Sequence, residues 1–290
     1  MRPRLLVTGG SGFLGGRLCA QAARAWEVSY TYRSRPLDPA LGSAHALDLR
    51  DPEAVARVVH AARPDVVLHA AYSPLESDFE AVIVGGTAAV ARAAAAARAS
   101  LLHVSTDMVF DGERAPYDED AAPRPVFPYG RAKAAAEAEA RRLCPGALVA
   151  RPSLLYSIRP PDPRFARNLA DLAAGRGVVL FHDEWRCPAE VGDVAAALLA
   201  VAARMAAERR PPAAPPLPRV LHLPGPERLS RWEFGVAALT ALGAPRATLR
   251  RGTARELGLV RPRDLALTAR RTPPELVRRL RPLAAVLAEA

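Results

Sequence analysis

The chain has 290 residues, half of them apolar, enough for one large α/β domain or a large domain with a small companion. Its formal net charge of +10 suits anionic partners, but the basic residues are spread along the chain without interleaved aromatic residues. This pattern argues against a nucleic-acid-binding protein.

Short apolar runs alternate with helical patterns in the first half of the chain, which is typical of βαβ units and a parallel sheet. The predicted strands are residues 5–8, 28–32, 45–49, 66–69, 101–105 and 148–151. The predicted helices are residues 12–25, a helix that begins at Pro52 with Asp51 as N-cap, 79–98 and 129–142. We therefore predict an α/β fold whose first domain, residues 1–151, is a Rossmann-like doubly wound parallel sheet.

The second half of the chain is less regular. Its predicted helices are residues 165–174, 191–207, 230–242 and 274–289. Its predicted extended segments are residues 178–181 and 220–223, and a proline-rich surface loop is predicted at 209–218. Residues 152–290 are expected to form mostly a small discontinuous C-terminal substrate-binding cap, with some segments returning to the first domain.

The terminal segment, the alanine tract and the cysteines predict a cytoplasmic protein. The first residues run into a strand with an apolar stretch too short for a secretory signal. The alanine tract at 88–99 carries Arg92 and Arg98, so no membrane span is expected. The cysteines are far apart and lack metal-ligand spacing, which favours a reducing compartment without disulfides or a zinc site: Cys19, Cys144 and Cys187.

A glycine-rich loop joins the first predicted strand to the first predicted helix. Gly9, Gly12 and Gly15 in this loop permit a tight turn, close approach to a pyrophosphate and close packing of helix on sheet. The amides at the start of the helix then face the phosphates. Because the loop follows a strand and opens a helix, it predicts a dinucleotide-binding site.

The end of the second predicted strand indicates which dinucleotide is bound. NAD-preferring enzymes usually carry an acidic residue here, but this strand ends in Tyr32-Arg33-Ser34-Arg35. Arg33 and Arg35 can pair with a 2′-phosphate, which favours NADPH, with NADH possible; simple surface charge is the alternative for either arginine. Asp48 and Leu49 are expected near the adenine, or else belong to a plain helix-entry loop.

Lys133 is the only lysine in a chain that otherwise uses arginine, which points to a position that needs a compact ammonium. Tyr129 precedes it by one helical turn, so both side chains share one helix face. A nearby ammonium is expected to lower the pKa of the phenol, so that Tyr129 exchanges a proton while the nicotinamide carries the hydride. Lys133 can also hold the cofactor ribose.

Two hydroxyl side chains follow the fifth predicted strand. Ser105 and Thr106 lie where that strand leaves the sheet, at the carboxyl edge where open α/β sheets bind ligands. A hydroxyl there can donate a hydrogen bond to a substrate carbonyl. The alternative for either residue is a hydroxyl that caps the backbone at the strand end.

Taken together, these segments resemble the extended short-chain dehydrogenases/reductases, and most closely the dTDP-4-dehydrorhamnose reductase family. The matching segments are Val7–Gly15, His69–Tyr72, Ser105–Gly112, Pro116–Glu119, Tyr129–Lys133, Arg151–Ser153 with Tyr156, Asp183–Pro188, Asp193–Ala195 and Arg261–Leu267. The resemblance implies Thr106, Tyr129 and Lys133 as catalytic residues and adds Phe13, Leu14, Ala70 and Ala71 to the cofactor site. It also implies NADPH-dependent reduction of a nucleotide-linked 4-keto-6-deoxyhexose.

Four residues are expected to contact the substrate: Ser105, Trp185, Arg186 and Arg261. Trp185 and Arg186 are expected to meet the sugar and diphosphate, and Arg261 to pair with a phosphate. The alternatives are core packing for Trp185 and surface ion pairs for the two arginines. Three histidines in or beside apolar strands are interpreted as core residues, and no metal site is predicted: His69, His103 and His182.

The sequence departs from the family pattern at several positions. Met108 stands where the family usually has tyrosine, Ile83 where asparagine is common, Ala189 where threonine is frequent, and Leu75-Glu76 replaces a valine-aspartate pair. Met108 also distinguishes the chain from sugar-nucleotide 4,6-dehydratases, which resemble this strand but carry a glutamate there for the elimination. We therefore expect reduction and not dehydration.

Two other functions are compatible with the same residues. One is a catalytically weak NADP-binding regulatory or sensor subunit, because a fold by itself does not determine a function. The other is a sugar-nucleotide epimerase that keeps its cofactor bound and shows no net oxidation. A homodimer is expected, since it is the commonest assembly of soluble proteins.

Overall fold

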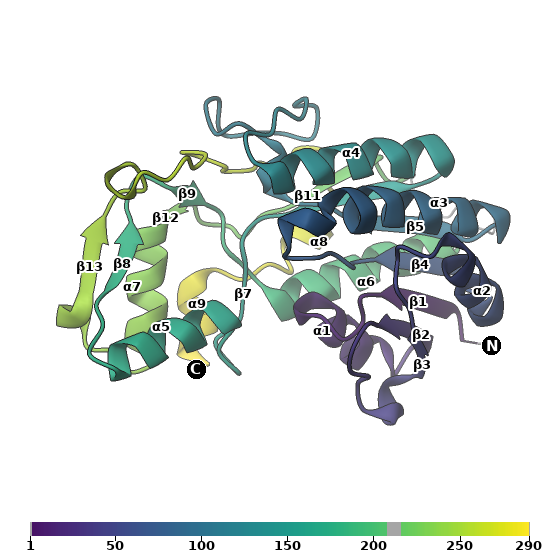
Figure 1. Ribbon diagram of the computed structural model, residues 1–290, viewed down its shortest axis with the longest axis horizontal. Coiled ribbons are helices and arrows are strands. Elements are labelled where there is room, and N and C mark those ends of the chain that lie inside the picture. Colours follow the sequence, from purple (N-terminus) through teal and green to yellow (C-terminus); the bar gives the residue numbers. More distant parts are fainter. Residues whose placement is uncertain (1, 208–215, 290) are drawn as a thin grey trace.

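In the computed structural model, which describes residues 2–207 and 216–289, seven parallel strands form the central sheet, in the order β11-β6-β5-β4-β1-β2-β3 (Figure 1). These strands are β1 Arg4–Thr8, β2 Glu27–Tyr32, β3 Ser43–Ala46, β4 Val66–His69, β5 Ser100–Val104, β6 Leu148–Pro152 and β11 Val220–Leu223. The strand order reverses between β1 and β4. Open α/β sheets bind ligands at the carboxyl edge beside such a reversal.

Helices cover both faces of this sheet. On one face, α1 Phe13–Ala22 packs against α6 Val191–Ala207 (Figure 1). The other face is covered by α2 Pro52–Ala62, α3 Gly86–Ala96 and α4 Pro128–Leu143. Successive side chains of β1 point to opposite faces of the sheet. Leu5 and Val7 pack in the core under α1 and α6, and Leu6 packs in the core under the other three helices.

A second, smaller lobe is built around its own apolar core. It contains α5 Pro163–Ala173, α7 Arg231–Ala241 and α9 Leu283–Ala288, with β8 Val178–Phe181 parallel to β13 Leu249–Gly252 (Figure 1). Two short ladders complete the strands: β9 Trp185–Arg186 pairs with β12 Leu229–Ser230, and β7 Leu155–Tyr156 pairs with β10 Ala189–Glu190. Short 3₁₀ turns are η1 Pro39–Leu41, η2 Glu76–Asp78, η4 Asp107–Val109, η5 Arg246–Thr248 and η6 Arg255–Leu257.

The predicted doubly wound parallel sheet is confirmed. Two elements that follow residue 151, α6 and β11, are built into the sheet and its helical layer. The domain limits placed at residue 151 remain a prediction. Asp51 caps α2 as expected, because its carboxylate accepts a hydrogen bond from the amide of Ala54 at 2.9 Å.

Three predicted elements differ from the structure. The strand predicted at 45–49 lies earlier, at Ser43–Ala46. The predicted helix 79–98 begins with a π-helical segment, η3 Phe79–Gly85, before α3. The closing helix predicted at 274–289 is instead two short helices, α8 Pro274–Val277 and α9, because Pro282 lacks an amide hydrogen and stands at the N-cap of α9. Most of the predicted loop 209–218 lies outside the described residues.

The helical segment Glu76–Ala96 is long and apolar enough to cross a membrane, judged by length and composition alone. The segment carries charged residues, Glu80 and Arg92 among them, so it is not an uncharged apolar stretch, and the absence of a membrane span remains a prediction. Fifty-six per cent of its most apolar window is buried inside the protein. Its α3 part packs between α2 and α4 against the sheet, and this packing accounts for its apolar composition.

Candidate active site

A cleft of about 730 Å³ lies at the carboxyl edge of the sheet, between the sheet and the second lobe. Most of the predicted site residues line it: Gly9, Gly12, Phe13, Leu14, Gly15, Arg33, Asp48, Leu49, Ala70, Ala71, Ser105, Thr106, Tyr129, Lys133 and Arg186. Arg35, Trp185 and Arg261 are not among the lining residues. One cleft thus joins the predicted cofactor loop to the predicted catalytic residues.

The glycine loop is shaped for close approach of a ligand. Gly9 adopts a positive φ of 70°, and a Cβ atom there would meet the backbone of Ala71 at 2.6 Å. A Cβ atom on Gly15 would meet the carbonyl oxygen of Gly9 at 2.1 Å. Gly12 is the N-cap of α1 and supplies no side-chain cap, so the first amides of the helix face the cleft without a side-chain acceptor. These features fit a dinucleotide pyrophosphate.

Arg33 and Asp48 lie at the end of the cleft where the second and third strands finish. The Arg33 guanidinium forms an ion pair with Asp78 at 3.6 Å and is 57% exposed, so it remains accessible to a 2′-phosphate. Hydrogen bonds from Arg50 lower the pKa of Asp48 to about 2, and this carboxylate is therefore already paired. Leu49 is buried and gives the cleft an apolar wall.

Tyr129 and Lys133 lie one turn apart on α4, but Lys133 is held by β5. Its ammonium donates to the carbonyl oxygen of Val104 at 2.6 Å and lies 3.4 Å from Nε2 of His103. The side chain is 3% exposed, and burial lowers the pKa of Lys133 to about 8. Two of its three donors thus face the strand, and the cleft can receive the third.

The pKa of Tyr129 differs from the expectation. Burial raises the pKa of the phenol, and the charge of Asp107 adds to this shift. Its ring packs edge-on against Tyr72 and Phe79, with centroids 6.2 and 5.8 Å away. The expected lowering by Lys133 is not found: burial is the largest cause of the shift, and Lys133 is not among the groups that cause it. Tyr129 is therefore a protonated phenol at neutral pH.

The turn after β5 places Ser105 and Thr106 at the floor of the cleft. Thr106 accepts a hydrogen bond from the amide of Met108 at 3.2 Å and donates to Asp107 at 3.3 Å. It therefore caps the 3₁₀ turn η4, as the alternative interpretation predicted, while it also lines the cleft. The hydroxyl of Ser105 is buried and has no partner among the described residues.

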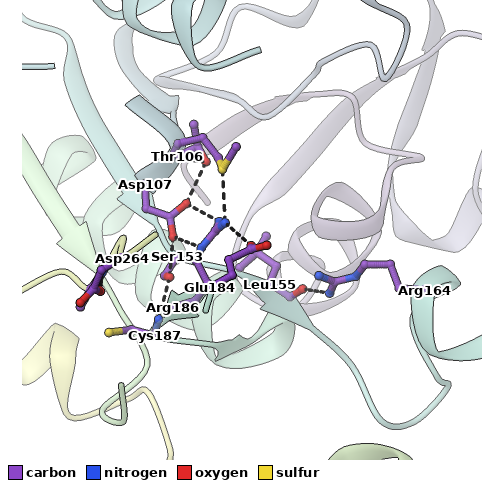
Figure 2. A network of polar contacts seen from close by, with 11 residues as sticks. Thr106, Asp107, Ser153, Leu155, Arg164, Glu184, Arg186, Cys187 and Asp264 are labelled. Carbon is purple, nitrogen blue, oxygen red and sulfur yellow. Dashed lines mark hydrogen bonds and ion pairs between the residues drawn. The ribbon is translucent and has the colours of Figure 1, made fainter. Parts of the chain in front are cut away.

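Arg186 reaches this turn from the second lobe (Figure 2). Its Nε and Nη2 atoms donate to the two carboxylate oxygens of Asp107 at 2.8 and 2.6 Å. Ser153 donates to the same carboxylate at 2.6 Å. The guanidinium thus lines the cleft but is paired within the protein, and its contact with the sugar and diphosphate remains a prediction.

Trp185 and Arg261 do not line the cleft, and their expected contacts with the substrate remain predictions. The Trp185 ring stacks under the guanidinium of Arg228, 4.0 Å from its centroid, and Arg228 pairs with Asp264 at 2.6 Å. Arg261 lies over the ring of Phe127 at 5.4 Å. Both side chains are thus engaged by neighbours outside the cleft lining.

Several lining residues were not predicted from the sequence. Tyr72, Ser73 and Phe79 follow β4, and Leu155 and Arg164 belong to the second lobe. Tyr72 closes the matching segment after β4, which was a usable signal. Arg164 carried none, because only the packing of α5 brings it to the cleft. Among residues 2–207 and 216–289, no group of three or more His, Cys, Asp or Glu is placed to hold a metal ion.

This sheet and cleft define a Rossmann-like nucleotide-binding protein of the short-chain dehydrogenase/reductase type. The chain belongs to the family described as the RmlD substrate binding domain, which it matches over residues 2–287. The resemblance found in the sequence motifs is thereby confirmed.

Two groups of relatives match the chain. A dTDP-4-dehydrorhamnose reductase from Mycobacterium tuberculosis is 35% identical over 212 residues, and the match spans 69% of this chain but only 66% of that protein. Methionine adenosyltransferase 2 subunit beta from Rattus norvegicus is 29% identical over 278 residues, spanning 91% of this chain and 80% of that protein.

Solved structures share the fold at low sequence identity. The dTDP-4-dehydrorhamnose reductase from Bacillus anthracis, solved in complex with NADP, has a TM-score of 0.77 at 22% identity and covers 100% of this chain and 98% of its own. The Bordetella bronchiseptica enzyme WbmH, solved with NAD⁺, has a TM-score of 0.80 at 16% identity and covers 100% and 97%. These two likenesses establish the architecture.

Proposed function

We propose that the protein is an NADPH-dependent reductase that converts the keto group of a nucleotide-linked 4-keto-6-deoxyhexose to a hydroxyl. The observation that carries this proposal is the single cleft that contains both the glycine loop and the residues Thr106, Tyr129 and Lys133. Membership of the family and the names of the mycobacterial and Bacillus relatives support the same reaction class.

The cofactor, when bound, supplies a hydride to the carbonyl carbon. The amides at the start of α1 hold its pyrophosphate, Arg33 pairs with the 2′-phosphate, and Lys133 donates its remaining hydrogen to the ribose. NADPH is favoured over NADH, because β2 ends in arginine and not in a carboxylate.

Tyr129 donates the proton. The raised pKa of Tyr129 keeps the phenol protonated at neutral pH, which suits the direction of reduction. Thr106 donates a hydrogen bond to the carbonyl oxygen and so stabilises the negative charge that develops there. Leu154 and Leu155 give the cleft an apolar wall on the side of the second lobe.

Dehydration is disfavoured by two features of the turn after β5. Met108 cannot transfer a proton, and Asp107 is fully buried and bound on both oxygens by Arg186. A carboxylate fixed in this ion pair is a poor general acid for elimination. Release of water from a nucleotide-linked hexose by the purified protein would contradict the proposed reduction-only activity.

The direct test is NADPH oxidation with a dTDP-linked 4-keto-6-deoxyhexose, compared with a Tyr129→Phe variant. We expect oxidation by the native protein and a loss of about 100-fold or more in the variant, the range typical of a general acid. Bound NADPH with no oxidation of several keto sugars would exclude the reductase.

A subunit role is the second candidate. It is favoured by the similarity to methionine adenosyltransferase 2 subunit beta, which spans more of the chain than the match to the reductase does. The hydrogen bond from the Lys133 ammonium to the Val104 carbonyl oxygen is also compatible with this role, because it gives Lys133 a structural contact within the protein. Stable capture of another protein, together with NADPH binding and no turnover, would favour this role over the reductase.

The buried state of all three free cysteines agrees with a cytoplasmic location, the compartment proposed for this enzyme. The homodimer remains a prediction, and size measurement in solution tests it.

A further inference from the structure

Arg186 lines the cleft, yet each of its three guanidinium nitrogens has a partner in the protein (Figure 2). Nε and Nη2 are bound to Asp107, while Nη1 lies 3.2 Å from the sulfur of Met108 and 3.5 Å from Glu184. The side chain is 8% exposed. Its planar fork is therefore matched to the carboxylate of Asp107 and is poorly placed to serve as a phosphate ligand.

The hydrogen bonds to Asp107 are unequal. One carboxylate oxygen accepts from Arg186 and Ser153 at 2.8 and 2.6 Å, and the other accepts from Arg186 at 2.6 Å and from Thr106 at 3.3 Å. A hydroxyl that donates to an unshared carboxylate usually lies about 2.5–2.7 Å away. The long Thr106 contact shows that this hydroxyl is only weakly held.

We infer that Arg186 is a positioning residue: by occupying both oxygens of Asp107, it leaves the Thr106 hydroxyl free to donate to the substrate carbonyl. This inference rests on the proposed reduction. The amide of Met108 already donates to Thr106, so the single hydroxyl hydrogen must choose between Asp107 and the substrate. A carboxylate without Arg186 would retain that hydrogen in a strong charge-assisted bond.

The geometry also gives the second lobe a part in the reaction. Arg186 belongs to β9, whereas Asp107 and Thr106 follow β5 of the central sheet. The Thr106 hydroxyl is therefore available to a substrate only while β9 is seated against the turn after β5.

The test is a set of four proteins: the native chain, Arg186→Gln, Asp107→Asn, and the double variant Arg186→Gln/Asp107→Asn. We expect Arg186→Gln to lower kcat about 100-fold, comparable to loss of one hydrogen-bond donor to a developing oxyanion, with KM changed much less. The double variant is expected to regain about tenfold or more in kcat over Arg186→Gln, because a neutral amide in place of the carboxylate no longer competes strongly for the Thr106 hydrogen. A mainly structural role would give no such recovery.

Arg164→Gln is the matched control, because Arg164 also lines the cleft but its guanidinium is bound to Asp162 and to the Leu155 carbonyl. Adding Asp107→Asn should not rescue it. If Arg186→Gln instead raises KM with kcat preserved, and Asp107→Asn gives no recovery, Arg186 is a substrate ligand and the inference is wrong.

Thermal unfolding and NADPH binding of each variant establish that the protein is folded. Should Arg186→Gln not fold, Arg186→Lys replaces it, since it keeps the charge but loses the fork; an intermediate kcat that Asp107→Asn again raises is then expected. A native protein that reduces no keto sugar overturns the proposed function and this inference with it. An active native protein with kcat of the Arg186 variant within about twofold of native overturns the inference alone.

Discussion

The ammonium of Lys133 donates a hydrogen bond to the carbonyl oxygen of Val104 across 2.6 Å, and this contact ties α4 to the end of β5. The neighbouring His103 is buried, and burial lowers its pKa well below the usual value, so its ring is neutral. The catalytic helix is thus anchored to the sheet through the same side chain that is expected to hold the cofactor ribose.

Lys133 should make stability depend on pH. Its pKa is about 8 in the folded protein and 10.5 in an unfolded chain, so between these values the unfolded chain binds more protons. The penalty for burying the charge is fully present below pH 8 and is relieved as pH rises toward 10.5, on the order of 3 kcal/mol in total. The difference in unfolding free energy between Lys133→Met and the native protein, from denaturant titrations at about pH 7 and pH 10, should shift in favour of the native protein at the higher pH. A difference independent of pH would mean that burial does not lower the pKa of Lys133 and that the side chain stays charged in the folded protein across this range.

Gly15→Ala should abolish NADPH binding and lower stability. The added methyl group would meet the Gly9 carbonyl oxygen at 2.1 Å, and a backbone atom can move away only by distorting the loop. Overpacking of this kind costs roughly 1–3 kcal/mol. Gly16→Ala in the same helix is the control, because its nearest atoms would be 3.9 Å away. Fluorescence titration with NADPH and thermal unfolding should separate the two variants; equal behaviour would contradict the proposed loop function.

Arg33→Ala should weaken NADPH binding about tenfold while it leaves NADH binding almost unchanged, since only NADPH carries the 2′-phosphate. Arg35→Ala provides the comparison, because Arg35 does not line the cleft. Dissociation constants for both cofactors should be measured for both variants. Equal losses for NADPH and NADH would assign Arg33 to a general electrostatic effect and not to the 2′-phosphate.

Glu137→Gln should destabilise the protein by about 3–5 kcal/mol, because it breaks a buried pair and leaves Arg151 without its counter-charge. The two side chains are 1% and 2% exposed and form two hydrogen bonds, at 2.9 and 2.7 Å. Glu139→Gln, on the same helix, removes a solvent-exposed ion pair with Arg142 and should cost much less than Glu137→Gln does. Chemical denaturation measures the loss of unfolding free energy in both variants. Similar losses would show that burial does not determine how much an ion pair contributes to stability.

Local patterns were sufficient for much of the fold and for the position of the glycine loop. The Gly9–Gly15 segment joins β1 to α1 and the Asp51 cap begins α2, as residues close in sequence predicted; that the loop binds a cofactor remains a prediction. Trp185 and Arg186 show the limit of such patterns. These two neighbours form one short strand, but Trp185 is covered by Arg228, whereas Arg186 enters the cleft wall to meet Asp107. Which neighbour does so is decided by the docking of the second lobe.

The departures from the family pattern also became interpretable only in three dimensions. Met108 places its sulfur beside Arg186, where it takes part in the network around Asp107. Ile83 is buried in a small apolar cluster with Phe79 and Tyr129. Ala189 is buried in the short ladder between β7 and β10. Each residue is accommodated by contacts with segments distant in sequence, which a single sequence does not reveal.

Lys133 is the only lysine of the chain and is buried. Reagents that acylate amines should therefore modify the side chains of the folded protein very slowly. Lys133 can therefore be modified only when the fold opens or when a reagent enters the cleft. The rate of modification at this one lysine measures how often either event occurs. Mass spectrometry of the peptide that contains Lys133 measures this rate. A bound dinucleotide should slow the acylation of Lys133, and unfolding should accelerate it.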